Sequence, residues 1–177
     1  MKKLFRPYLT AFLLGALLIS TTSCGDDDDP EPIVEEENIT SMTLRLEPVA
    51  TDKGIDPVEA TFTAGTTPAL NLRSNTQYTA TITFNDKIED EIREEAEDHE
   101  IFFEVSEDLV VVQKIIPEDF DSNGRPVGLT TRMVTGNAGG TGDLKITLKH
   151  QPDLKNDESD ITVGETDVAA TFKVTIQ

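Results

Sequence analysis

Tryptophan is absent from this chain of 177 residues, and cysteine occurs once, at Cys24. Tyrosine occurs twice, at Tyr8 and Tyr78. Glycan-binding sites usually rely on flat aromatic platforms, so this composition disfavours carbohydrate recognition. A lone cysteine has no partner for a disulfide within the chain. Because Cys24 directly follows an apolar leader, a thiol nucleophile in a folded domain is disfavoured as well.

Basic residues are also few, with 15 Lys and Arg against 34 Asp and Glu and a net charge of −19. A phosphate backbone needs a basic surface and would be repelled here, so we expect no nucleic-acid partner. The G-x-S-x-G motif of serine hydrolases is missing from the sequence. Carboxylates are so numerous that chance pairs carry no weight. We therefore expect a protein that is not an enzyme.

The N-terminus has the layout of a secretory signal. Lys2, Lys3 and Arg6 precede an apolar run over residues 8–19, and small residues then lead to Cys24. The run is shorter than the roughly 20 residues that a membrane span requires. This arrangement resembles a lipobox, which implies a signal peptide over 1–23 and a mature N-terminal Cys24 that carries acyl chains such as palmitate. The alternative is an unmodified cysteine in a secreted protein.

Four aspartates, Asp26–Asp29, follow Cys24 almost directly. Such a run resembles the export signal of surface lipoproteins in Bacteroidota, which implies a lipid anchor in the outer membrane and exposure at the cell surface. The alternative is a solvated spacer with no receptor. Residues 24–38 contain eight acids, no bases and two prolines. This composition predicts an extended, disordered tether that leads to one domain over 39–177.

Alternation of apolar and polar residues recurs along 39–177 and predicts strands. Burial of one face with a threonine-rich outer face is typical of an antiparallel β-sandwich, here immunoglobulin-like with about eight strands. The apolar, β-branched run Leu109–Ile116 is suited to a central strand. The expected strands cover 42–46, 58–64, 70–72, 78–84, 101–105, 109–116, 144–148 and 168–176.

One acidic segment breaks the strand pattern. Residues 86–100 contain strong helix formers and neither Gly nor Pro, which predicts a short helix near 87–98. Ile88, Ile92 and Ala96 are spaced to face a sheet, and Asp86 is placed to cap the helix. Residues 86–108 hold twelve acids. They indicate either a solvated face or a surface that attracts cations or a basic partner.

Four stretches resemble a family of small Bacteroidota lipoproteins usually labelled "type 1 periplasmic binding fold superfamily protein". They are EIREEAEDHEIFF at 91–103, DFDSNGRPVGL at 119–129, LKHQP at 148–152 and GETDVAATF at 164–172. The label implies two doubly wound α/β lobes, whereas the length and the alternation predict a single β domain. The resemblance implies no activity for this chain. It gives a hint of association with outer-membrane receptors.

The first candidate site is Asp119-Phe120-Asp121-Ser122-Asn123-Gly124, which opens like a calcium-binding loop. Asp119, Asp121 and Asn123 would be the ligands. Position twelve of the loop is Thr130 rather than Glu, so an EF-hand is excluded. The alternative is a β-hairpin without an ion, because Asn-Gly is a strong hairpin signal.

The second candidate site uses His99 and His150, the two histidines of the chain. Glu95 lies four residues before His99, so the two would share one face of the expected helix. His150 continues the apolar series 144, 146 and 148 and is expected at the core-facing end of its strand. If the helix and the strand end meet, the three side chains form a zinc site. The alternative is two unrelated histidines.

Taken together, these features predict a lipid-anchored outer-membrane lipoprotein that acts as a non-enzymatic binding or accessory protein. Calcium and zinc are the candidate cofactors, and the membrane is a partner through Cys24. The alternative function is a protein-interaction module that docks on an outer-membrane receptor, for which an exposed apolar patch or a bare edge strand would be the sign.

Overall fold

The structure, a computed structural model, describes residues 38–49, 54–106 and 109–177. The expected signal peptide, Cys24 and nearly all of the acidic tether lie outside the described residues. Among the described residues, no helix combines the length and the apolar character of a membrane span.

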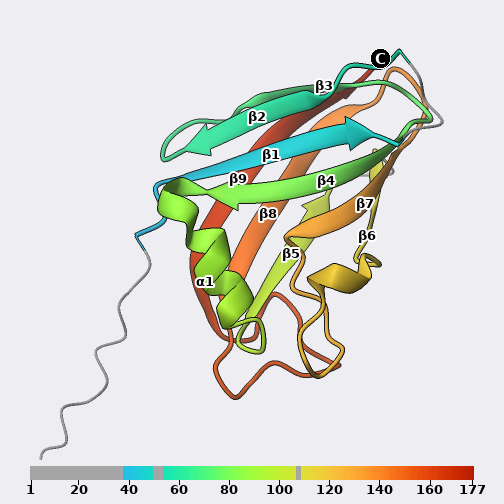
Figure 1. The fold of residues 1–177 in the computed structure, drawn as a ribbon. Helices are drawn as coiled ribbons and strands as arrows, with labels where there is room; N and C mark the ends of the chain where they lie inside the picture. Colours follow the sequence, from blue (N-terminus) through green and yellow to red (C-terminus); the bar gives the residue numbers. More distant parts are fainter. Residues whose placement is uncertain (1–37, 50–53, 107–108) are drawn as a thin grey trace, which may run out of the picture. The chain divides into compact units, whose positions relative to one another are not determined.

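The described chain is built mainly of strands, with one short α-helix between the fourth and fifth strands (Figure 1). The elements are β1 (Ser41–Pro48), β2 (Val58–Thr63), β3 (Ala69–Leu72), β4 (Gln77–Phe84), the 3₁₀ turn η1 (Asn85–Lys87), α1 (Ile88–Glu94), β5 (His99–Val105), β6 (Val110–Gln113), the 3₁₀ turn η2 (Pro117–Asp119), β7 (Thr130–Thr135), β8 (Thr141–His150) and β9 (Glu165–Ile176).

The strands form two sheets that face each other. One sheet has the order β2-β1-β4-β7-β6 and the other has the order β3-β9-β8-β5. All pairs are antiparallel except β3 and β9, which run parallel. The predicted β-sandwich is therefore confirmed, with one parallel pair at an edge. The two α/β lobes implied by the family label do not occur in the part of the chain that the structure describes.

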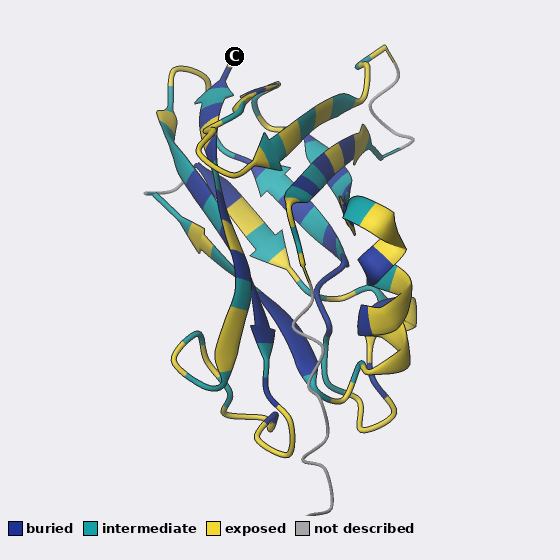
Figure 2. Ribbon diagram, turned by 90° about the vertical axis from the view of Figure 1, so that its left-hand side faces the viewer, coloured by how far each residue is buried: buried dark blue, intermediate teal, exposed yellow. Residues whose placement is uncertain are grey.

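Alternation places the core between the sheets (Figure 2). Along β4, Tyr78, Ala80 and Ile82 are buried while the threonines between them are partly exposed. Phe172 and Val174 of β9 fill the opposite side. The core includes Ile88 and Ile92 of α1, and Ala96 packs against it. The expectation that these three residues face the sandwich is confirmed.

The helix is shorter than predicted and begins without the expected cap. It spans Ile88–Glu94 rather than 87–98, and residues 95–98 continue as turns. Asp86 does not cap it, because Asp86 and Lys87 both have left-handed backbones, with φ of 56° and 64°. Glu89 instead reaches back and accepts a hydrogen bond from the Phe84 N–H at 3.0 Å. The tight turn η1 therefore takes the place of an Asp cap.

Two strand predictions need correction. The run Leu109–Ile116 does not form a central strand, because only Val110–Gln113 is extended and β6 lies at the edge of its sheet. Strand β7 is an additional strand that the pattern did not predict. Its inward positions are Thr131, Met133 and Thr135, all buried, so apolar alternation is missing from its sequence.

Candidate functional site

Strand register brings the two histidines together at one end of the β3-β9-β8-β5 sheet. His99 is the first residue of β5 and pairs directly with His150, the last residue of β8. The same register pairs Ile101 with Leu148 and Phe103 with Ile146, so the histidines continue the core-facing rows of both strands. His99 is buried and His150 is partly exposed.

Glu95 reaches this pair by a route that the sequence pattern did not predict. We expected Glu95 and His99 to share a helix face, which is wrong, because α1 ends at Glu94 and His99 already belongs to β5. The turn at 95–98 closes over His99 instead. The Nδ1 of His99 lies 3.1 Å from the backbone carbonyl of Glu95. Since a carbonyl only accepts hydrogen bonds, Nδ1 carries the proton and Nε2 keeps its lone pair.

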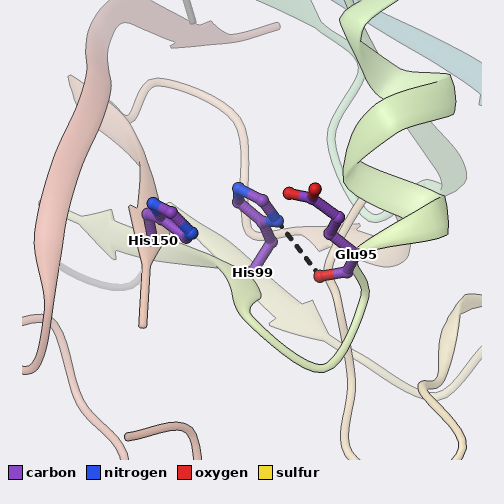
Figure 3. A group of neighbouring side chains, drawn as sticks. All are labelled: Glu95, His99 and His150. Atoms are coloured by element: carbon purple, nitrogen blue, oxygen red, sulfur yellow. Dashed lines mark hydrogen bonds between the residues drawn. The ribbon is translucent and has the colours of Figure 1, made fainter. Parts of the chain in front are cut away.

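The side chains of Glu95, His99 and His150 converge (Figure 3). One ligand atom from each lies within 4.8 Å of the others. The imidazole rings stack with their centroids 4.7 Å apart and their planes 8° from parallel. Among the described residues, these three side chains are the one group of His, Cys, Asp or Glu residues that lie close enough together to hold a metal ion.

Asp167 lies beside this group, and sequence reasoning missed it. The pairing of β8 with β9 shifts between Leu148 and Lys149, and Asp167 is the extra residue on β9 at this bulge. Its Oδ2 lies 4.0 Å from Nε2 of His99. A break in the alternation of β9 before Val168 is the signal that could have indicated it, because a bulge redirects a side chain.

Burial controls the electrostatics of the cluster. Loss of water lowers the pKa of His99, an effect opposed by the hydrogen bond to the Glu95 carbonyl and reinforced by nearby His150. Burial raises the pKa of Asp167 to about 6, although the neighbouring His150 favours its charged form. A neutral imidazole beside a carboxylate is the state in which His99 can act as a metal ligand.

Three further contacts fix the backbone around the cluster. The Gln151 N–H donates to the Asp98 carbonyl at 2.6 Å, and Lys155 Nζ donates to the Ala96 carbonyl at 2.7 Å. Gly164, with φ of 72°, lies so close that a Cβ at this position would overlap the His150 carbonyl oxygen. The end of β8 and the turn after α1 are therefore held in place by groups that are not themselves candidate ligands.

The other candidate site, Asp119, Asp121 and Asn123, is arranged as a turn. Asp121 Oδ1 accepts hydrogen bonds from the N–H groups of Asn123 and Arg125, at 2.9 and 2.8 Å. The Gly124 N–H bonds to the Asp121 carbonyl, and Phe120 bridges to Pro126. Gly124 takes a φ of 78°, but Asn123 does not have a positive φ, so the segment is a tight turn closed by one bridge and not the type I′ turn typical of Asn-Gly.

A lysine occupies the place that a cation would take beside Asp121. Lys155 Nζ lies 3.0 Å from Asp121 Oδ2, and both side chains are almost fully buried, with 1% and 0% exposed. Asp119 is separately engaged, because its Oδ2 accepts the Gly128 N–H at 2.7 Å and its Oδ1 lies 3.6 Å from Arg93. These contacts favour a turn without an ion over a calcium loop.

Comparison of the chain with protein-family models, with curated proteins and with solved structures returned no match. The geometry of the cluster at the β5–β8 end is therefore the main basis for a functional proposal.

Proposed function

We propose that this chain is a lipid-anchored outer-membrane lipoprotein, not an enzyme, whose sandwich domain binds one transition-metal ion through Glu95, His99 and His150. The observation that supports it is the convergence of one carboxylate and two imidazoles to within 4.8 Å. The donors come from three separate elements: the turn after α1, the start of β5 and the end of β8. Their convergence is therefore not a consequence of helical spacing.

The donor chemistry favours zinc over calcium. Imidazole nitrogen with carboxylate oxygen suits zinc and similar ions, whereas calcium takes oxygen ligands alone. The Nδ1–H of His99 already donates to a carbonyl, just as a zinc-bound histidine donates its other N–H to a second-shell acceptor, and this leaves Nε2 for the metal.

Metal binding requires a small rearrangement of the cluster. Lone pairs lie in the ring planes, so two stacked imidazoles do not point at a common ion. Tetrahedral zinc needs its donor atoms about 3.3 Å apart, because Zn–N distances are about 2.0–2.1 Å. His150 is the less buried ring, so we expect it to turn while His99 stays in place.

Isothermal titration of the full chain, purified in detergent, with Zn²⁺ tests the proposal. We expect one zinc per chain, and at least tenfold weaker binding in Glu95→Gln and His150→Gln. Glu94→Gln is the matched control, because Glu94 is the exposed neighbour on α1 and carries the same charge. Absence of zinc binding in the wild-type chain, or equal losses in all three variants, would refute the metal site.

The anchor is proposed from the sequence of the N-terminal region. A charged start, an apolar run and small residues precede Cys24, and the four aspartates after it support export to the cell surface. Cys24→Ser should release the protein from the membrane fraction and abolish labelling by a palmitate analogue. Protease treatment of intact cells then tests surface exposure, since a protein on the inner leaflet would be protected.

The alternative function, docking on an outer-membrane receptor, is favoured by the edge strand β6. Val111 of this strand is 58% exposed, and Ile115 just beyond it is 54% exposed. An unpaired edge with exposed apolar side chains can add a strand from a partner. Copurification of one integral membrane protein, lost in Val111→Lys, would support docking. No such partner would leave metal binding as the proposed function.

A further inference from the structure

Asp167 lies beside the proposed metal site, with its Oδ2 4.0 Å from Nε2 of His99. Its Oδ2 is buried and has no hydrogen-bond partner in the described part of the chain. A buried carboxylate oxygen without a donor is costly, so such an atom calls for an explanation.

The orientation of His99 leaves Asp167 Oδ2 without a donor from this ring. Its Nδ1 donates to the Glu95 carbonyl, so Nε2 presents a lone pair. That nitrogen faces Asp167 Oδ2 across 4.0 Å. Two acceptors that face each other are satisfied by a shared cation, and a metal ion bound to both would meet the needs of each.

The backbone places Asp167 there through an irregular feature of the sheet. Regular pairing of β8 with β9 would send alternate side chains to opposite faces, with Val168 directed into the core opposite Leu148. The bulge inserts Asp167 and turns its side chain toward His99. Bulges often occur beside functional sites because they redirect single side chains.

We propose that Asp167 is the fourth ligand of the metal, which makes a closed site of two imidazoles and two carboxylates. This inference rests on the proposed function of Glu95, His99 and His150. Four protein ligands fill a tetrahedral shell and leave no position open for a substrate. The site would then hold a resident or stored ion and would not activate water.

Cobalt(II) loaded into the full chain in detergent provides the test, because four-coordinate cobalt absorbs visible light far more strongly than six-coordinate cobalt. We expect intense bands for the wild type. Asp167→Asn should weaken the bands and lower zinc affinity by at least the roughly 10–100-fold that loss of an outer-shell partner typically causes, since a direct ligand is removed. Glu104→Gln is the control, since it removes one charge from an exposed position at the far end of β5. It should bind like the wild type.

The outcomes separate the two proposals. If Asp167→Asn retains the wild-type spectrum and affinity, the fourth ligand is wrong while the three-residue site stands. If the wild type binds neither metal, both proposals fall. Melting of the metal-free variants detects a purely structural role for Asp167, which would lower stability without weakening cobalt absorption in the variant.

Discussion

The buried pair Lys155–Asp121 should be among the most sensitive points of the fold. Both side chains are almost fully buried, and Lys155 also donates to the Ala96 carbonyl next to the proposed metal site. Removing one partner of such a pair leaves a buried charge uncompensated, which costs about 3–5 kcal/mol. That is a large part of the roughly 5–15 kcal/mol of stability of a typical domain.

Urea denaturation followed by circular dichroism measures the effect. We expect Lys155→Met to lower the free energy of unfolding by about 3–5 kcal/mol. The corresponding loss in melting temperature is about 9–15 °C, at roughly 3 °C per kcal/mol for a domain of this size. The double variant Lys155→Met, Asp121→Asn should lose less than the sum of the single variants, because neither charge remains buried alone.

The control is an ion pair in the same region whose acidic partner is exposed to solvent. Arg125 bonds to Asp157 at 2.9 Å, and the Asp157 side chain is 86% exposed. An exposed pair contributes about 0–1 kcal/mol, so Asp157→Ala should change little. If Lys155→Met is no more harmful than this control, the reasoning about burial is refuted. Calcium should leave the wild-type melting temperature unchanged, because Lys155 already neutralises Asp121.

Three further predictions concern backbone geometry and pH. Gly164→Ala should destabilise the fold and weaken zinc binding, because its Cβ overlaps the His150 carbonyl; titration calorimetry and urea denaturation measure both effects. Gly65→Ala, with φ of 82° but open space around its Cβ, should cost only about 1 kcal/mol and spare zinc binding. Burial raises the pKa of Asp119, so ionisation opposes folding as pH rises through that pKa. The free energy of unfolding of Asp119→Asn minus that of the wild type should therefore increase as the pH is raised from about 4 to 7, measured by urea denaturation. A difference that stays constant with pH would contradict this sign.

Much of the sandwich was predictable because apolar and polar residues alternate along most of its strands. The four inward residues of β4, from Tyr78 to Phe84, are all buried as the pattern predicts. Strand β7 was missed because threonine fills two of its three inward positions. The predicted central position of β6 was wrong, because a β-branched apolar run indicates an extended backbone but not which strands lie beside it. Val111 of this strand faces solvent at the edge of the sheet.

The candidate site was only partly predictable. The sequence identified Glu95, His99 and His150, yet the helical spacing of the first two was the wrong reason for their proximity. The direct pairing of His99 with His150 depends on strand register. A short hairpin turn fixes the register and can be recognised in a sequence, whereas β5 and β8 are separated by 35 residues. Asp167 depends on a bulge, for which the break in apolar alternation before Val168 is the one sign in the sequence.

The surroundings of the cluster also bear on the kind of metal site it would be. The backbone around it is held by Gln151 and Lys155, through bonds to the Asp98 and Ala96 carbonyls. Small zinc domains, by contrast, fold only when the metal binds, because the metal replaces a core. Here the apolar core between the two sheets is built from residues other than the proposed ligands, although buried His99 lies at its edge. The domain should therefore be folded without zinc, and an ion present at 100 times its dissociation constant should add only about 2.7 kcal/mol. A fold that persists without its ion suits reversible binding and release better than a purely structural role.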